Sequence, residues 1–322
     1  MELPITWDDA VAARARIARY LAPTPLRSYR ALDDEVGAGI RVLVKHENHL
    51  PTNAFKARNA LAVLTSLDPA QRARGVIAAT RGNHGAGLAW AGGLLGVPVV
   101  ICVPIGNSPD KNAAMRGFGA ELIERGRDYD EAAAIAAELA AERGLYVAHS
   151  TNNAQVIAGA TSLAIEICEQ ADHLDALVVA VGGGSQAVGA IVATRALRPA
   201  VAVYGVQAAG ASAIHDSWHA RARKTIASAE TFADGLATRA TYDLTWPSLR
   251  DGLAGFVAVD DAAIGAALRT LLRTTHNLAE GAGAAGLAGL IALRDQLAGK
   301  TVGVVLSGSN IDEPVLRRVL TA

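Results

Sequence analysis

The feature that most constrains the fold is a regular alternation of short β-branched runs with alanine-rich amphipathic stretches. The runs "VPVVICVP", "ALVVAVGGG" and "TVGVVLSGSN" have the length of strands, and "DYDEAAAIAAELAAERG" has the length and composition of a helix. Buried parallel strands read as continuous apolar runs, and their alternation with helices is typical of parallel sheets covered on both faces. The pattern therefore predicts an α/β fold with parallel-rich open sheets covered by helices.

The charge balance gives no sign of a polyanionic partner. The 322 residues include 30 basic and 31 acidic side chains, for a formal net charge of −1. We therefore expect no nucleic-acid partner and no anionic membrane surface. No apolar run is smooth and long enough to span a bilayer, and the N-terminus lacks the apolar core of a signal peptide.

The cysteine content points to a reducing compartment. Cys102 lies in an expected strand and Cys168 in an expected helix, and no second pair exists to complete a zinc site. A cytoplasmic location without a metal ion is the simplest expectation.

The segment "PTNAFKARNA", residues 51–60, holds a lysine in a run that otherwise reads as mostly buried. Burying an unpaired ammonium is costly, so Lys56 either extends its charge to solvent or begins an exposed helical turn. Alternatively, the amine forms an imine with a carbonyl cofactor. The segment alone leaves these alternatives open.

A glycine-rich loop comes after one of the expected strands. In "VVAVGGGSQAVGA", Gly182, Gly183, Gly184 and Ser185 stand between a strand and a helix, where backbone amides can approach a phosphate. A tight turn is the alternative, although one glycine would suffice for it. The loop fits the dinucleotide pattern G-x-G-x-x-A, but the next strand ends in Gln207 rather than an acid. A small phosphorylated cofactor therefore fits better than NAD or ATP.

Two further loops come after expected strands. "TRGNHGAG" combines backbone amides with polar side chains, a mixture that suits carboxylate binding, although Asn83 or His84 alone is more often a turn or cap residue. In "SGSN", Ser307 either caps the next segment of the chain or meets a ring nitrogen. A lysine, a phosphate loop, a carboxylate loop and a terminal serine together point to pyridoxal phosphate.

These motifs resemble, in the same order, those of the serine/threonine dehydratase group of fold-type II pyridoxal-phosphate enzymes. The motifs are "KHENHLPTNAFKARNA", "TRGNHGAG", "VGGGSQAVG", "FADGL", "AEGAGAAGLAGL" and "VVLSGSN", and the resemblance covers nearly the whole chain. It implies a tryptophan synthase β-like fold with two domains. We expect a large cofactor-binding domain from residues 1–72 and 149–322, a small domain from residues 73–148, and a homodimer.

The resemblance also implies roles for individual residues. Lys56 holds the cofactor and then acts as acid and base at the substrate's α-carbon, while Phe55 packs beside the ring and Ser307 faces its nitrogen. Asn83 donates to the phenolic oxygen, and the 182–185 loop holds the phosphate. The substrate site is expected to include Thr80, Arg81, Gly82, Asn83, His84 and Thr238.

The implied activity is an ammonia-lyase (dehydratase) acting on a β-hydroxy-α-amino acid of the serine or threonine type, with a 2-oxo acid and ammonia as products. Alternatives are 3-hydroxyaspartate or 3-phenylserine as substrate, and β-replacement as the reaction. A racemase or a non-catalytic cofactor-binding protein is less favoured.

The chain departs from its family at two places. Arg81 stands where relatives carry serine or alanine; an arginine stays charged and is a poor proton shuttle, which disfavours racemisation. It either pairs with a second substrate carboxylate or points to solvent. Relatives that require a divalent cation have acids at the positions of Gln207 and near Ala213, so we expect no metal requirement here.

Overall fold

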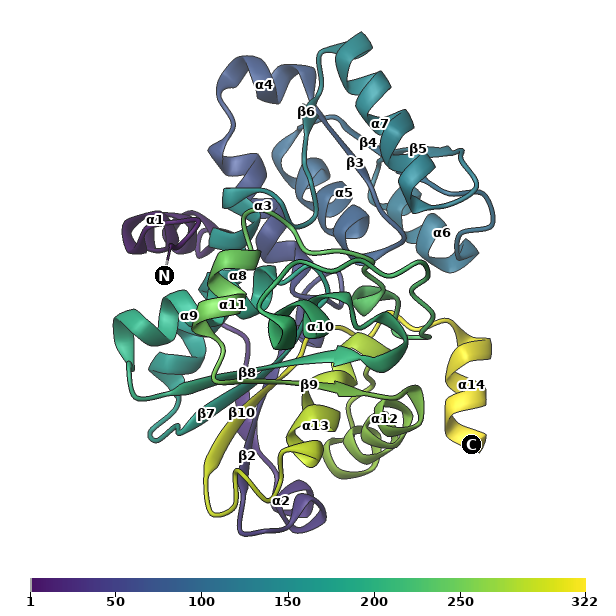
Figure 1. Ribbon diagram of the computed structural model, residues 1–322. Coiled ribbons are helices and arrows are strands. Elements are labelled where there is room, and N and C mark those ends of the chain that lie inside the picture. The colour runs from purple at the N-terminus through teal and green to yellow at the C-terminus, as the bar shows by residue number, and fades with distance from the viewer. Residues whose placement is uncertain (1) are drawn as a thin grey trace.

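The computed structural model describes residues 2–322, which form two open sheets with helices packed around them (Figure 1). The six-stranded sheet has the order β1-β2-β10-β7-β8-β9, and every neighbouring pair is parallel except the edge pair β1–β2. Its strands are β1 (Leu26–Ser28), β2 (Arg41–His46), β7 (Ala176–Ala180), β8 (Ala202–Ala208), β9 (Gly255–Val259) and β10 (Thr301–Leu306).

The second sheet has four parallel strands in the order β5-β4-β3-β6. Its strands are β3 (Val76–Ala79), β4 (Val99–Val103), β5 (Glu121–Glu124) and β6 (Tyr146–Val147). All four lie within residues 73–148, the range expected for the small domain. The α/β fold class with parallel-rich open sheets is confirmed.

Helices follow most strands, as the sequence pattern predicted. They are α1 (Trp7–Ile17), α2 (Arg30–Val36), α3 (Lys56–Ser66), α4 (Pro69–Arg74), α5 (Asn83–Leu95), α6 (Pro109–Gly117), α7 (Tyr129–Arg143), α8 (Ala154–Gln170), α9 (Ser185–Leu197), α10 (Ala213–Ala220), α11 (Trp246–Gly252), α12 (Asp261–Thr275), α13 (Gly281–Ala292) and α14 (Glu313–Thr321). Short 3₁₀ turns are η1 (Glu47–His49), η2 (Ala209–Ala211) and η3 (Asp234–Leu236).

Side chains alternate between two apolar layers along the strands of the large sheet. Val302 and Val304 of β10 pack with α12 and α13, whereas Val305 belongs to the layer formed by α1, α3, α8 and α9. The second layer continues without interruption to one face of the small sheet, where Ile101 and Val103 of β4 join it. This shared core fixes the two sheets relative to each other, so that loops from both can build one site.

The other face of the small sheet carries a separate apolar cluster. Val100 and Cys102 of β4 pack there against the alanines of α7. The start of α7 is set by Asp128, whose carboxylate accepts a hydrogen bond from the Glu131 amide and caps the helix. The sheet is thus covered on both faces, as a parallel sheet requires.

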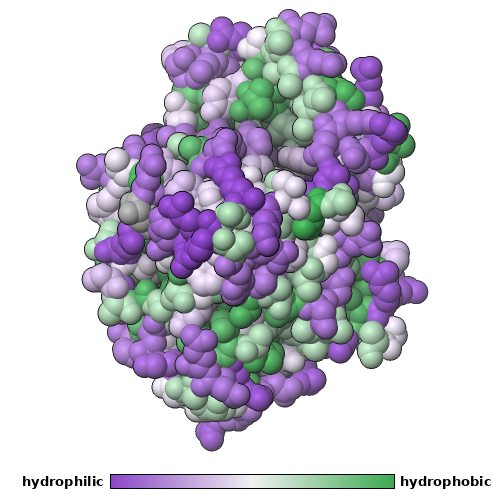
Figure 2. Space-filling view, viewed as in Figure 1, coloured by the Kyte–Doolittle hydropathy of each residue, from purple (hydrophilic) through white to green (hydrophobic). Residues whose placement is uncertain are grey.

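The surface in Figure 2 is mainly hydrophilic, and apolar side chains lie on it in small, scattered groups. Within residues 2–322, no helix has both the length and the apolar character needed to cross a membrane.

Candidate active site

A cavity of about 860 Å³ lies where loops from both sheets meet. Strands β3, β6, β7 and β10 all deliver their carboxyl ends to it, the usual ligand position in open α/β sheets. Every site residue predicted from the sequence lines this cavity: Phe55, Lys56, Thr80, Arg81, Gly82, Asn83, His84, Gly182, Gly183, Gly184, Ser185, Thr238 and Ser307. Residues from the two ends of the sequence thus share one wall.

Lys56 is the first residue of α3 and extends into the cavity. The segment before it is held by β-like pairing to the end of β10: the Phe55 amide donates to the Ser307 carbonyl at 3.0 Å, and Ala54 bridges to Gly308. The Lys56 amine donates to the Ser150 carbonyl at 3.2 Å and lies 4.9 Å from the centre of the Phe55 ring.

The amine of Lys56 has no carboxylate partner within hydrogen-bond distance among residues 2–322. Burial lowers the pKa of Lys56 to about 8, and the charge of Glu280 opposes this effect only in part. A larger fraction of the amine is therefore unprotonated near neutral pH than in an exposed lysine, and the unprotonated amine is the nucleophilic form.

The glycine loop 182–184 is shaped by close contacts that exclude any side chain. A Cβ at Gly182 would lie 2.1 Å from the Gly235 carbonyl oxygen, and one at Gly183 would lie 2.1 Å from Thr151 Oγ1. Gly184 has φ of +101°, a conformation that favours glycine. The loop enters α9, whose first turn has no side-chain cap, so its amides remain available to an anion.

Gln207 and Thr238 hold the glycine loop in place through hydrogen bonds. Gln207 is fully buried; its carbonyl oxygen accepts from the Ile214 and His215 amides, and its amide group donates to Thr238 Oγ1 at 3.2 Å. Thr238 in turn donates to the Gly182 carbonyl at 3.2 Å. The glutamine that excluded a dinucleotide site thus connects α10 to the glycine loop.

The 80–84 loop crosses from β3 to α5 along one wall of the cavity. Thr80 is buried, and its hydroxyl oxygen accepts from the Gly82 amide at 3.1 Å. His84 Nε2 donates to the Ala148 carbonyl at 2.7 Å. Burial lowers the pKa of His84 to about 3, and the neighbouring Lys56 charge acts in the same direction, so the imidazole stays neutral. A neutral, fixed His84 serves to position the loop.

Arg81 is the exposed residue of that loop. Its side chain lines the cavity, and within residues 2–322 it forms no ion pair. The guanidinium is therefore free to meet an anionic group that enters the cavity.

Several lining residues were missed by the sequence reasoning. Glu280, Lys111, Asp234, Tyr129 and His149 all contribute to the cavity wall. Glu280 precedes the glycine-rich helix α13, and an acid directly before such a helix was the one available signal. The others lie on helices and loops whose facing directions depend on how the two sheets pack together.

The cavity fits pyridoxal phosphate. The glycine loop and the uncapped start of α9 offer a phosphate cradle, and Lys56 offers an amine of lowered pKa beside the Phe55 ring. Ser307, 5% exposed at the end of β10, offers a neutral hydroxyl. No group of three or more His, Cys, Asp or Glu side chains within residues 2–322 is arranged to hold a metal ion.

Comparison with known proteins agrees with this fit. A family described as "Pyridoxal-phosphate dependent enzyme" matches residues 17–308. L-threo-3-hydroxyaspartate ammonia-lyase of Pseudomonas is 34% identical over 307 residues, covering 95% of this chain and 96% of that protein. L-threonine ammonia-lyase of Geobacter sulfurreducens is 38% identical over 275 residues, covering 85% of this chain and 68% of that protein.

Among solved structures, maize serine racemase superimposes with a TM-score of 0.93 at 29% identity, covering 99% of this chain and 97% of that one. The fold-type II architecture that the motifs implied is thereby confirmed. The chain belongs to the pyridoxal-phosphate dependent enzymes, in the serine/threonine dehydratase group that its motifs resemble.

Proposed function

We propose that this protein is a pyridoxal-phosphate-dependent ammonia-lyase that removes water from a β-hydroxy-α-amino acid. The observation that carries the proposal is the convergence of Lys56, the 80–84 loop, the glycine loop and Ser307 on one cavity. The relatives named as ammonia-lyases, at 34% and 38% identity, support the same activity.

Pyridoxal phosphate, when bound, supplies an electron sink for negative charge at the substrate's α-carbon. Lys56 is proposed to hold the cofactor and then to take the proton from the α-carbon, because its amine has a lowered pKa. The 80–84 loop binds the substrate carboxylate through its amides. Ser307 would face the ring nitrogen with a neutral hydroxyl, which, unlike a carboxylate, would not stabilise a proton there and so would favour prompt loss of the β-hydroxyl.

The overall reaction is balanced without a further reactant. The substrate loses its α-proton and its β-hydroxyl as one water molecule, and hydrolysis of the resulting enamine consumes one water molecule. The products are a 2-oxo acid and ammonia.

Serine or threonine is the default substrate, and 3-hydroxyaspartate is the alternative best supported by the site. Arg81 lines the cavity, is exposed, and could pair with a second carboxylate. Two relatives at 34% and 32% identity, from Pseudomonas and Saccharomyces cerevisiae, are named L-threo-3-hydroxyaspartate ammonia-lyase. The third candidate is 3-phenylserine, whose ring could contact apolar lining residues such as Ala133, Ala136 and Val147.

The first experiment is an assay of 2-oxo acid release from serine, threonine, threo- and erythro-3-hydroxyaspartate, and 3-phenylserine. Strong release from one of them, lost in Lys56→Ala, is the expected result. Consumption of a second nucleophile with little oxo acid would indicate β-replacement instead. Interconversion of enantiomers without oxo acid would indicate a racemase, which the fixed charge of Arg81 disfavours. A bound cofactor with no turnover of any kind would indicate a non-catalytic protein.

We also propose that the protein is a homodimer located in the cytoplasm. Buried, unpaired Cys102 and Cys168 are consistent with a reducing compartment. Light scattering on the purified holoenzyme tests the dimer, and fractionation of the native cells tests the location.

A further inference from the structure

Glu280 is a carboxylate in the cavity wall for which the proposed reaction has no role. It stands immediately before α13, and its side chain does not cap that helix but extends toward the 80–84 loop. Its amide donates to the Gly308 carbonyl at 3.0 Å. A Cβ at Gly308 would lie 2.7 Å from Glu280 Oε1, so the glycine of "SGSN" leaves room for this carboxylate.

The carboxylate of Glu280 is the end of a chain of three hydrogen bonds that begins at the backbone. Asn310 Nδ2 donates to the Thr52 carbonyl at 2.8 Å and to Asn83 Oδ1 at 2.7 Å. Asn83 Nδ2 then donates to Glu280 Oε1 at 2.6 Å. Because a carbonyl only accepts, the Thr52 carbonyl fixes which end of the Asn310 amide faces Asn83.

Two separate hydrogen bonds therefore determine the orientation of the Asn83 side-chain amide. Asn310 requires the Asn83 oxygen on its side, and Glu280 requires the Asn83 nitrogen on the other. The nitrogen carries two hydrogens, of which Glu280 takes one. The second remains for a ligand in the cavity, which Asn83 lines. A flipped amide would place an oxygen against Glu280 and could not donate to that ligand.

The charges around Glu280 come from three elements. Lys56 of α3 and Lys111 of α6 are the cations, and Asp234 of η3 is the other acid. Lys111 is itself paired with Asp234 at 2.6 Å. Burial raises the pKa of Glu280 to about 7, while Lys111 and the Asn83 hydrogen bond act in the opposite direction. The Glu280 carboxyl group is therefore only partly ionised near neutral pH, and each of its forms keeps an oxygen that can accept from Asn83.

We propose that Glu280 is a positioning residue that, together with Asn310, turns the Asn83 amide so that its free N–H points to the phenolic oxygen of the bound cofactor. This inference rests on the cofactor placement in the proposed function. It assigns a task to a residue that neither the motifs nor the reaction itself required.

The test is a pair of variants of similar size, with the absorption spectrum of the bound cofactor as readout. Glu280→Gln keeps an oxygen that accepts from Asn83, whereas Glu280→Met keeps the volume and removes the acceptor. A hydrogen bond to the phenolic oxygen favours its anionic form and hence the visible band over the near-ultraviolet band. We expect Glu280→Met to lower the ratio of visible to near-ultraviolet absorbance and to weaken cofactor affinity roughly tenfold or more. Glu280→Gln should retain most of both.

Asp234→Asn is the matched control, since it removes one negative charge from the same wall without touching Asn83. Because the charge of Asp234 opposes ionisation of Glu280, its removal should not lower the band ratio. An unchanged ratio in Glu280→Met, or equal shifts in Glu280→Gln and Glu280→Met, would overturn the inference, because the orientation of Asn83 would then not depend on an acceptor at position 280.

Thermal unfolding of each variant separates a spectral change from a loss of fold. Lys56→Ala separates this inference from the proposed function. Survival of the covalent cofactor band in Lys56→Ala would refute the cofactor placement, whereas loss of that band together with unaltered Glu280 variants would refute the positioning role alone.

Discussion

The Lys56 amine is partly buried and has no acidic hydrogen-bond partner within residues 2–322. Its protonation state can be followed through the rate at which the apoprotein binds pyridoxal phosphate covalently. Burial lowers the pKa of Lys56 to about 8, and above that pH the amine is mainly in its nucleophilic form. We expect the loading rate to rise with pH up to about 8 and then to level off. Stopped-flow absorbance between about pH 6 and 10.5 measures it. A rate that still rises tenfold per pH unit above about pH 9 would show an ordinary lysine.

Arg81 is the residue from which substrate preference can be tested most directly. Its side chain is exposed and lines the cavity, without an ion-pair partner within residues 2–322. If Arg81 binds a second carboxylate, Arg81→Ala should lower kcat/KM for 3-hydroxyaspartate about 10- to 100-fold, the usual range for the loss of a charged hydrogen bond. The same variant should change kcat/KM for threonine little. Steady-state assays on both substrates decide it. An equal loss on both would assign Arg81 a structural role.

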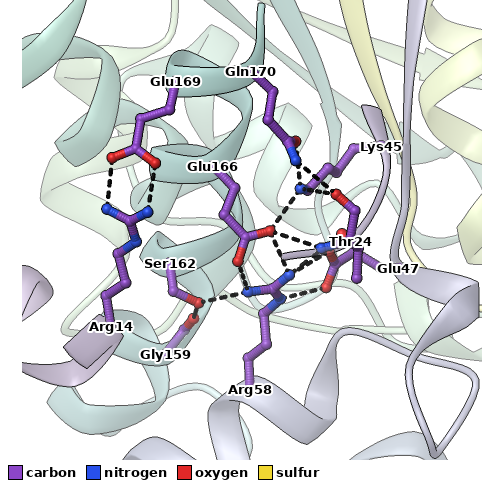
Figure 3. A network of polar contacts seen from close by, with 10 residues as sticks. All are labelled: Arg14, Thr24, Lys45, Glu47, Arg58, Gly159, Ser162, Glu166, Glu169 and Gln170. Carbon is purple, nitrogen blue, oxygen red and sulfur yellow. Dashed lines mark hydrogen bonds and ion pairs between the residues drawn. The ribbon is translucent and has the colours of Figure 1, made fainter. Parts of the chain in front are cut away.

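At the level of elements, α3 is held in place by a buried network of two cations and two anions (Figure 3). Arg58 lies two residues after Lys56, and its guanidinium donates to Glu47 at 2.7 Å and to Glu166 of α8 at 2.6 Å. Lys45 of β2 binds Glu166 at 2.6 Å. Arg58, Lys45 and Glu47 are fully buried, so each charge depends on its partners.

Removing Arg58 should therefore be severe. Arg58→Met leaves two buried carboxylates undercompensated, and we expect the free energy of unfolding to fall by about 3–5 kcal/mol. Arg14→Met is the matched control. Arg14 of α1 binds Glu169 at 2.6 Å, and Glu169 lies on α8 like Glu166, but both side chains of this pair are partly exposed. The free energy of unfolding should therefore fall by only about 0–1 kcal/mol. Urea denaturation of the apoproteins measures both. Equal losses of unfolding free energy in the two variants would contradict the difference in burial between the Arg58 network and the Arg14–Glu169 pair.

The glycine loop offers a test of close approach between elements. In Gly183→Ala, the new Cβ would lie 2.1 Å from Thr151 Oγ1, so the loop or Thr151 must move. We expect cofactor affinity to fall at least tenfold, because the backbone amides leave their phosphate-binding arrangement. In Gly117→Ala, the new Cβ would have no described atom within 4 Å outside its own helix backbone and chain neighbours, so the cofactor affinity should not change. Equilibrium titration with pyridoxal phosphate compares the two, and unchanged affinity in Gly183→Ala would separate the loop from the phosphate.

The ease of prediction also differed between elements. Strands such as β7 and β10 are long apolar runs, and their loops carry the glycines and serine of the site, so both could be predicted from the sequence. Strand β9 was missed because its burial is mixed and it lies at a sheet edge, where the apolar signal is weak. Glu280 and Lys111 were missed because the packing of α13 and α6 around the cavity, rather than any local pattern, brings them together.

For the molecule as a whole, the sequence predicted two parallel-rich sheets but not which side chains connect them. Several polar contacts join residues 73–148 to the remainder, and the hydrogen bonds of Asn83 to Glu280 and Asn310 are two of them. Lys111 pairs with Asp234 at 2.6 Å, Ser108 donates to Asp312 at 2.7 Å, and Asp130 forms an ion pair with Arg239. Such contacts depend on the distance between the two parts, which no periodicity in the sequence encodes.

The Asp130–Arg239 pair provides the last prediction, because both residues line the cavity from opposite parts of the chain and both are about half exposed. An exposed pair contributes only about 0–1 kcal/mol to stability, so Asp130→Ala and Arg239→Ala should unfold like the wild type. If the pair holds the two parts together over a bound substrate, each variant should instead raise KM a few-fold while kcat stays nearly constant. The double variant should be no worse than either single one, since both remove the same interaction. Added salt should reduce the difference in KM between each variant and the wild type, because ions screen exposed charges. Additive effects on KM at all salt concentrations would show that the two residues act independently, and that the two parts approach each other without this contact.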